Sequence, residues 1–259
     1  MDFLSTIVRD KLADVEAACR TISQEDLAAQ SRDRDAVRDF TAAMTRDGVN
    51  IIAEIKRASP SKGPIRLDLD PVELATAYEA GGAAAISILT EERHFLGSLA
   101  DLQAARSAVN LPVLRKDFIL TDYQVYESAA SGADALLLIV RLLEKNQLVD
   151  LLGLTRELGL AALVELYDDA DLETIDGLGP AVIGINNRDL KTFQTDLAIS
   201  KRIAAQLDEH HVPVAASGIF TRADIEGNLA LGIHGFLIGE SLVRSDDPAS
   251  MLRELRGDV

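Results

Sequence analysis

The sequence has a single cysteine, so an internal disulfide is excluded. Cys19 is the only thiol among 259 residues, and we expect it to be a small buried hydrophobic residue rather than a nucleophile. Long apolar runs are also absent, since stretches such as residues 135–140 are far shorter than the roughly 20 residues that cross a bilayer. Asp2 and Arg9 interrupt the beginning of the chain, which lacks the basic and apolar segments of a secretory leader. These absences predict a cytoplasmic protein without a transmembrane helix.

Positive charge is scarce as well. The chain has 26 Lys and Arg residues against 42 Asp and Glu residues, which gives a formal net charge of −16. Because no long basic stripe is present to neutralise phosphates, we do not expect nucleic-acid binding. The negative field would also repel an anionic ligand, so a site for such a ligand needs Lys and Arg gathered at one place.

Short apolar runs alternate with longer segments of helical period from residue 50 onward. This is the pattern of repeated βα units around a parallel sheet, and most runs are too continuously apolar for a one-sided antiparallel sheet. The eight runs begin near Ile51, Ala83, Pro112, Ala133, Leu160, Ala181, Val212 and Gly235. The fold class is therefore predicted to be α/β, with a (β/α)8 TIM barrel over residues 50–259.

Helix boundary signals support this alternation. Proline suits a first helical turn, hydroxyl and acidic residues suit N-termini, and glycine suits helix ends. The expected boundaries are Pro71 in a first turn, Thr121-Asp122 and Thr221 at N-termini, and Gly132, Gly159 and Gly232 at helix ends. A doubly wound open sheet is the alternative, but eight regular units favour closure, and no GxGxxG motif follows the first strand.

The first 45 residues lie outside this repeat and are predicted to form a helical extension of a single domain, residues 1–259. A second helix is expected to start at Ser23, where Asp26 gives the spacing of a capping box, and a third to cover residues 36–44. The barrel is the large apolar partner available to these helices. The first helix has one apolar face, made by Phe3, Leu4, Ile7, Val8, Leu12 and Val15.

Charged and polar residues end most of the eight apolar runs. Functional groups of such barrels lie at the carboxyl ends of the strands, so these residues are predicted to meet on one rim. Two lysines, two carboxylates and an asparagine suit proton transfer to a carbonyl or imine; salt bridging around the mouth is the alternative. We expect neighbouring cations to lower the pKa of the two lysines. The residues are Glu54 and Lys56, 115–118 with Lys116, Glu165, 186–189 with Asn186, 217–219 and 239–241.

The last two run ends suggest a phosphate site. Ser217-Gly218 and Gly239-Glu240-Ser241 offer backbone N–H groups, and glycine lets a ligand approach the chain closely. A strand-end glycine by itself is often only a turn residue. The two segments together nevertheless favour a phosphorylated small-molecule substrate.

Residues 52–63 have the sequence IAEIKRASPSKG, which resembles the signature of the indole-3-glycerol-phosphate synthase family. Further segments resemble this family in its order: LRKDF at 114–118, VE at 164–165, GINNRDL at 184–190, SGI at 217–219 and GESL at 239–242. The similarity covers nearly the whole chain, including the N-terminal extension. It implies a decarboxylating lyase of tryptophan biosynthesis that needs no cofactor and no metal.

The resemblance also implies a reaction and its catalytic residues. The family closes the indole ring of 1-(2-carboxyphenylamino)-1-deoxyribulose 5-phosphate with loss of carbon dioxide and water. Lys116 and Lys56 then share the acid roles, and Glu54 and Glu165 are their carboxylate partners. Asn186 orients substrate hydroxyls or a catalytic side chain. The step that each lysine serves stays open.

The binding residues follow from the same resemblance. Arg188 suits the substrate carboxylate, because its guanidinium is a planar two-donor fork, and Ser59 and Ser217 are positioning groups. Phe95 and Phe118 sandwich the anthranilate ring, although either could be ordinary barrel packing. The phosphate is held by backbone N–H groups of Gly218, Gly239 and Glu240, with Lys56 nearby.

One departure from the family pattern is Ala216, where the family commonly has a glutamate before the Ser-Gly of the seventh run. A barrel that binds the same ligand but turns it over poorly is therefore one alternative function. Another phosphosugar barrel, such as an isomerase of phosphoribosyl anthranilate, is a second. Its acid–base pair would be cysteine and aspartate, and Cys19 lies outside the barrel repeat. We expect a monomer.

Overall fold

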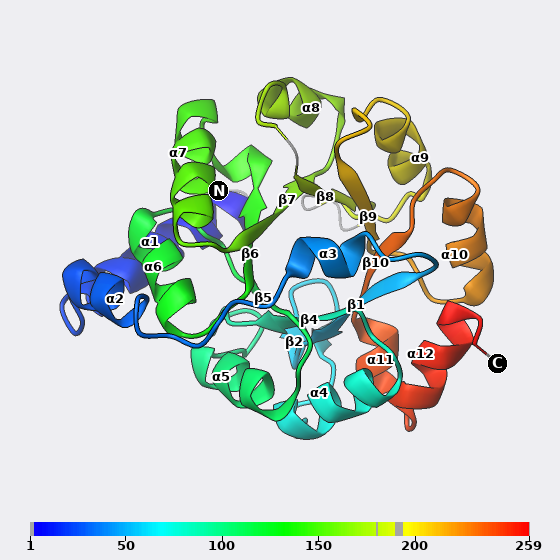
Figure 1. The fold of residues 1–259 in the computed structure, drawn as a ribbon, viewed down its shortest axis with the longest axis horizontal. Coiled ribbons are helices and arrows are strands. Elements are labelled where there is room, and N and C mark those ends of the chain that lie inside the picture. Colours follow the sequence, from blue (N-terminus) through cyan, green and yellow to red (C-terminus); the bar gives the residue numbers. More distant parts are fainter. Residues whose placement is uncertain (1–2, 180, 190–193, 259) are drawn as a thin grey trace.

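Eight parallel β-strands form a closed barrel in the computed structural model, which describes residues 3–179, 181–189 and 194–258 (Figure 1). Asp2, Leu190 of the segment 184–190 and the side chain of Phe3 lie outside the described residues. Each predicted apolar run contains one strand, so the predicted TIM barrel is confirmed. The strands are β1 (Asn50–Ile55), β4 (Ala85–Leu89), β5 (Val113–Lys116), β6 (Ala135–Ile139), β7 (Ala161–Leu166), β8 (Val182–Asn186), β9 (Val212–Ala216) and β10 (Gly235–Ile238).

The first and last strands of the barrel pair with each other. β1 is hydrogen-bonded to β10 on one side, with Asn50 opposite Gly235, and to β4 on the other, with Ile52 opposite Ala85. Each of these eight strands therefore has two neighbours, and the sheet has no open edge. The alternative of a doubly wound open sheet is wrong.

Helices follow the strands and surround the barrel (Figure 1). Two short antiparallel strands, β2 (Ala58–Ser59) and β3 (Gly63–Pro64), follow β1, and a 3-10 turn, η1 (Val140–Leu142), follows β6. None of the described helices is long and apolar enough to cross a membrane. The helices of the repeat are α4 (Pro71–Ala80), α5 (Leu99–Ala108), α6 (Asp122–Ala130), α7 (Lys145–Glu157), α8 (Asp169–Ile175), α9 (Ala198–Ala204), α10 (Arg222–Leu229), α11 (Glu240–Arg244) and α12 (Pro248–Arg256).

The predicted helix boundaries have physical counterparts. Pro71 is the first residue of α4, and Thr221 caps α10 by accepting a hydrogen bond from the backbone N–H of Asp224. Thr121 lies at the N-cap of α6 but makes no capping hydrogen bond with its side chain. Positive φ angles, which glycine adopts without strain, occur just beyond α6, α7 and α10. The residues there are Gly132, Gly159 and Gly232.

Three helices precede the barrel: α1 (Phe3–Cys19), α2 (Gln24–Gln30) and α3 (Phe40–Met44). Ser23 caps α2 by accepting a hydrogen bond from the N–H of Asp26, as predicted. α3 is shorter than the predicted helix over residues 36–44. Asp39 caps it, and the preceding N–H, that of Arg38, is held by the Asp134 carboxylate instead of entering a helical turn.

α3 closes the end of the barrel at which the strands begin. Figure 1 shows this short helix lying across the barrel. Asn50, the first residue of β1, donates from its side-chain amide to the carbonyls of Met44, at 3.3 Å, and Arg46, at 2.7 Å. Phe40 and Met44 are buried with side chains that fill the barrel interior. This end is therefore packed, and the carboxyl ends of the strands are left for a site.

α1 lies against the opposite end, and two predictions about its side chains are wrong. Ile7 is buried with the barrel interior, as predicted. Leu12 is 44% exposed, and its neighbour Lys11 is buried instead, because Lys11 pairs with the buried Asp117. Cys19 is exposed rather than buried, because it is the last residue of α1 and turns toward solvent.

A buried ion pair fixes α1 to the barrel. Lys11 Nζ lies 2.7 Å from Asp117 Oδ1, and Arg115 Nη2 lies 3.1 Å from Asp117 Oδ2. Burial would raise the pKa of Asp117, but the charges of Arg115 and Lys11 hold it below its ordinary value. Because Asp117 stands between Lys116 and Phe118, α1 helps to fix the segment that follows β5.

Candidate active site

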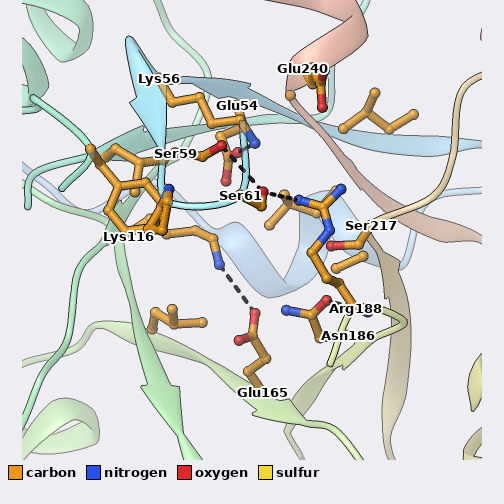
Figure 2. Close-up of a pocket in the computed structure, with 18 of the residues that line it drawn as sticks. Glu54, Lys56, Ser59, Ser61, Lys116, Glu165, Asn186, Arg188, Ser217 and Glu240 are labelled. Carbon is orange, nitrogen blue, oxygen red and sulfur yellow. Dashed lines mark hydrogen bonds and ion pairs between the residues drawn. The ribbon is translucent and has the colours of Figure 1, made fainter. Parts of the chain in front are cut away.

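A pocket opens at the carboxyl ends of the barrel strands (Figure 2). Because the eight strands run in the same direction, residues far apart in the sequence meet at this rim. Their convergence is observed, and their chemical roles stay predictions. The lining includes every residue predicted for catalysis or binding: Glu54, Lys56, Ser59, Phe95, Lys116, Phe118, Glu165, Asn186, Arg188, Ser217, Gly218, Gly239 and Glu240.

The first lysine–carboxylate pair stands at the end of β1. Lys56 Nζ lies 2.6 Å from Glu54 Oε1, and only 3% of the Glu54 side chain is exposed. Burial would raise the pKa of Glu54, but the charges of Lys56 and Lys116 lower it below its ordinary value. Glu54 is therefore a charged carboxylate at neutral pH, beside two cationic groups.

The second pair joins β5 to β7 across the pocket. Lys116 Nζ lies 3.1 Å from Glu165 Oε2, and a dashed line in Figure 2 marks this ion pair. Burial would lower the pKa of Lys116, but the charges of Glu165 and Glu54 outweigh it and raise the pKa above its ordinary value. The prediction that cations lower this pKa is wrong, because the charges that act most strongly on Lys116 are carboxylates. Lys116 is protonated at neutral pH.

Arg188 links the loops that follow β8 and β1. Its Nη1 lies 3.2 Å from Ser61 Oγ, which lies 3.5 Å from Ser59 Oγ (Figure 2). The backbone N–H of Arg188 donates to Asn186 Oδ1 at 3.0 Å. Asn186 thus fixes the turn that carries the guanidinium to the pocket wall.

Apolar side chains make up a second part of the lining. The rings of Phe95 and Phe118 have centroids 6.2 Å apart and planes tilted by 50°. Leu4 from α1, Leu137 from β6 and Leu237 from β10 also line the pocket. The two rings are not parallel, so they do not form a ready-made sandwich. They provide an apolar surface that suits a flat aromatic ring.

The ends of β9 and β10 bring backbone to the pocket. Ser217 and Gly218 both have positive φ, 67° and 81°, so the chain turns sharply at the end of β9. A Cβ on Gly239 would lie only 3.1 Å from Lys56 Nζ and 2.6 Å from Glu54 Oε1. Glycine at position 239 therefore lets the first lysine–carboxylate pair stand directly against the β10 backbone.

Two side chains after β10, those of Glu240 and Ser241, are arranged in a way that suits an anion. Glu240 Oε1 lies 3.3 Å from Arg244 Nε, one turn along α11, so an ion pair within the helix holds this carboxylate. Ser241 lines the pocket, and its Oγ is buried without a hydrogen-bond partner in the described part of the chain. A free hydroxyl beside backbone N–H groups suits an oxyanion ligand.

Residues 4–255 match the family described as indole-3-glycerol phosphate synthase. The chain belongs to this family. It is 56% identical over 258 residues to the indole-3-glycerol phosphate synthase of Desulfosudis oleivorans, and the match covers 98% of each chain. It is 46% identical over 259 residues to the indole-3-glycerol phosphate synthase of Syntrophobacter fumaroxidans, with 99% of this chain and 98% of the relative covered.

Solved structures outside the indole-3-glycerol phosphate synthase family share the fold. A crystal structure of 3-hexulose-6-phosphate synthase has a TM-score of 0.64 and 15% identity, and the match covers 82% of this chain and 100% of that one. A structure of the tryptophan synthase α2β2 complex from Pyrococcus furiosus has a TM-score of 0.60 and 15% identity, covering 82% and 99%. At this identity the likeness concerns the barrel alone.

Ala216, which the sequence predicted to face the pocket, is the last residue of β9. It lines the pocket and is 3% exposed. In the register of the sheet it stands beside Asn186 of β8 and Leu237 of β10. The side chain therefore faces the pocket, as the sequence predicted.

Ala216→Glu, which adds a carboxylate at the end of β9, is expected to move the alkaline limb of kcat to higher pH. An added negative charge raises the pKa of a nearby protonated lysine. We expect kcat itself to change less than about tenfold, since Glu54 and Glu165 already supply carboxylates. The pH dependence of kcat is compared with that of Ala216→Gln, which has the same shape without the charge. Identical profiles for the two variants would contradict this prediction.

Among the polar residues that line the pocket, sequence reasoning missed Tyr167 and Ser61. Tyr167 stands two positions after Glu165, so the strand period of two places it on the same side of the chain. That period is a signal that could have found it. Ser61 lies inside the segment 52–63 that resembles the family, but no role was predicted for it.

The structure also groups possible metal ligands away from the pocket. Among the described residues, the side chains of Asp208, His210 and His211 have ligand atoms within 4.8 Å of one another. They lie in the loop between α9 and β9, before the strand begins. This is the end of the barrel opposite the carboxyl ends, so an ion held there would not reach the pocket.

Proposed function

We propose that the protein catalyses the reaction of its family, the closure of the indole ring of 1-(2-carboxyphenylamino)-1-deoxyribulose 5-phosphate with loss of carbon dioxide and water. The product is indole-3-glycerol phosphate. One observation carries the proposal: two buried lysine–carboxylate pairs, Lys56–Glu54 and Lys116–Glu165, meet in one pocket. General acid–base catalysis needs acids and bases held in fixed positions, and the two pairs meet that need.

Lys116 serves the step that forms the ring. The substrate's aromatic carbon bonds to the ketose carbonyl carbon, and the carbonyl oxygen takes a proton from Lys116 Nζ. The raised pKa of Lys116 keeps that proton available at neutral pH. Carbon dioxide then leaves from the same aromatic carbon, and the electron pair of the broken bond restores the aromatic ring. Phe118, two residues further on, supplies apolar surface for the ring.

The loss of water needs one acid and one base. The acid protonates the leaving hydroxyl, and the base takes the proton that is released as the new double bond forms. Each lysine–carboxylate pair holds one of each, with Nζ–Oε distances of 2.6 Å for Lys56–Glu54 and 3.1 Å for Lys116–Glu165. Either lysine meets the requirement of this step.

The carboxylate and the phosphate of the substrate bind at separate places in the pocket. Arg188 binds the carboxylate that is later lost, because its guanidinium is a fork of two parallel donors. The phosphate binds at the ends of β9 and β10, where Gly218, Gly239 and Ser241 line the pocket and Lys56 is close. Lys56 and Arg188 thus supply the local positive charge that a protein of net charge −16 needs for an anionic ligand.

Turnover of 1-(2-carboxyphenylamino)-1-deoxyribulose 5-phosphate tests the proposal. We expect one mole of carbon dioxide to be released for each mole of indole product, which is measured by its fluorescence. The chain contains no tryptophan, so the protein adds no indole emission of its own. Tight binding without carbon dioxide release would instead support the weakly catalytic barrel. The isomerase alternative has no support from the site, since Cys19 lies at the end of α1 and is not among the residues that line the pocket.

Gly218→Ala is expected to raise KM by about tenfold or more and to change kcat less, because it disturbs phosphate binding rather than chemistry. A Cβ at this position would lie 2.6 Å from Thr195 Cγ2 and 3.0 Å from Leu197 Cδ2, at a φ of +81°. Gly232→Ala is the matched control, since it has a φ of +78° but no atom within 4 Å of the added Cβ. Unchanged affinity of Gly218→Ala for inorganic phosphate and substrate would place the phosphate elsewhere.

A further inference from the structure

Tyr167 follows β7 and reaches both the second acid–base pair and the asparagine of β8. Its hydroxyl donates a hydrogen bond to Glu165 Oε1 and accepts one from Asn186 Nδ2 at 3.3 Å. The residue is 5% exposed and lines the pocket. A polar group so deeply buried sits in a fixed hydrogen-bonding arrangement, because losing a partner there is costly.

The two oxygens of Glu165 have different partners. Oε1 accepts from Tyr167, and Oε2 lies 3.1 Å from Lys116 Nζ. The hydrogen bond from Tyr167 therefore fixes the rotation of the carboxylate about its Cγ–Cδ bond, with the second oxygen directed toward the lysine. Burial and then the negative charge of Glu165 raise the pKa of Tyr167 well above its ordinary value. The hydroxyl stays protonated and acts as a permanent donor.

Arg141 holds the same ring from outside the pocket. It belongs to η1, is not among the pocket-lining residues, and its Cζ lies 4.1 Å from the centroid of the Tyr167 ring. Its Nη2 is 3.0 Å from Asp168 Oδ2 and 3.2 Å from Asp171 Oδ2. Asp171 also accepts a hydrogen bond from the Tyr167 N–H at 2.7 Å. Carboxylates at the start of α8 thus hold both the guanidinium of Arg141, by ion pairs, and the backbone of Tyr167, by a hydrogen bond.

We propose that Tyr167 is a positioning residue for the reaction: it orients Glu165 toward Lys116, and Arg141 stacked on its ring keeps it in place. The inference rests on the proposed function, because it assigns Lys116 and Glu165 to one acid–base pair. It adds a residue that does not itself transfer a proton to the substrate. Titration of Lys116 in the ligand-free protein tests it independently of turnover.

Tyr167→Phe removes the hydroxyl and keeps the ring, its packing and the stacked arginine. We expect kcat to fall about 10- to 100-fold, as for the loss of one hydrogen bond to a charged group, with KM within about threefold. The pKa of Lys116, followed by NMR of selectively labelled lysine without substrate, should fall, because a carboxylate that turns away no longer raises it. The alkaline limb of kcat should move to lower pH by the same amount.

Tyr123→Phe is the matched control. It removes a tyrosine hydroxyl that donates to the Ile22 carbonyl at 3.2 Å, outside the pocket lining. We expect a similar loss of stability, an unchanged Lys116 titration and a kcat within about twofold of the unmodified protein. If Tyr167→Phe behaves like this control, the tyrosine is only packing and the proposal fails.

A double-mutant cycle with Arg141→Gln tests the outer contact. Arg141→Gln alone should lower kcat several-fold and shift the Lys116 titration in the same direction. In the Tyr167→Phe background it should lower kcat by less than about twofold, because it acts through the missing hydroxyl. If Arg141→Gln lowered kcat in the Tyr167→Phe background as much as it does alone, the link between the two residues would be refuted. A loss above about 1000-fold in Tyr167→Phe with an unchanged Lys116 titration would make the tyrosine the proton donor and overturn the positioning role.

If the unmodified protein does not turn over the substrate, the proposed function fails, and the Lys116 titration still decides the geometry. A lower Lys116 pKa in Tyr167→Phe would then support the orientation of Glu165 by Tyr167 in the absence of that reaction. The same pKa in both proteins would refute the orientation.

Discussion

Lys116→Met is expected to lower kcat by at least about 100-fold, the usual loss for a positioned general acid. Methionine keeps a long unbranched side chain but has no proton to give to the carbonyl oxygen. KM should change by less than about threefold, because phosphate and carboxylate binding use other residues. Steady-state kinetics by carbon dioxide release and indole fluorescence measure both constants.

The control for Lys116→Met is Lys201→Met, which removes an exposed lysine from α9 and should leave both constants unchanged. Lys116→Met also leaves Glu165, whose side chain is 2% exposed, without its cation, so thermal unfolding must show that the variant is folded at the assay temperature. A folded variant that keeps more than about a tenth of the original kcat would remove Lys116 from the mechanism.

Glu54→Gln is expected to lower kcat by about 100-fold and to move its alkaline limb to lower pH. The negative charge of Glu54 is one of the causes that raise the pKa of Lys116. Without that charge the lysine loses its proton at lower pH, and activity that depends on the proton disappears with it. Glutamine keeps the size of the side chain, so packing around the strand end is preserved.

The same variant should change how stability depends on pH. The pKa of Glu54 is below its ordinary value in the folded protein. Its charged form therefore stabilises the fold above the ordinary pKa, and that contribution is lost as the pH falls through the lower folded value. Glu54→Gln lacks this dependence, which urea unfolding at several acidic pH values measures. Glu157→Gln, on the exposed surface of α7, is the control for both measurements, and a kcat profile of Glu54→Gln like that of the control would exclude Glu54 from the site.

The barrel and the membership of the pocket were predictable for one physical reason. Parallel strands that are buried on both faces read as continuous apolar runs, and their carboxyl ends meet at one rim. Reading the residues after each run therefore brought Glu54, Lys116 and Glu165 together although more than a hundred positions separate the first from the last. The two strand-end glycine segments entered the pocket for the same reason.

Side-chain pairing across the barrel was not predictable in this way. The sequence suggested that neighbouring cations lower the pKa of Lys116, but its strongest charged neighbours are Glu165 from β7 and Glu54 from β1. Helix periodicity likewise placed Leu12 on the buried face and left out Lys11. The period counts only apolar residues, so it cannot predict a lysine that is buried by pairing with Asp117. Such partners are set by tertiary contacts.

The pairing of β1 with β10 also constrains when the protein can fold. About 180 residues separate these strands, and at roughly 5–20 residues per second a ribosome needs about 10–40 s to make them. Until β10 has been made, one hydrogen-bonding edge of β1 lacks its native partner, and an apolar strand with a free edge is prone to aggregate. Closure of the barrel is therefore a late event in the synthesis of the chain.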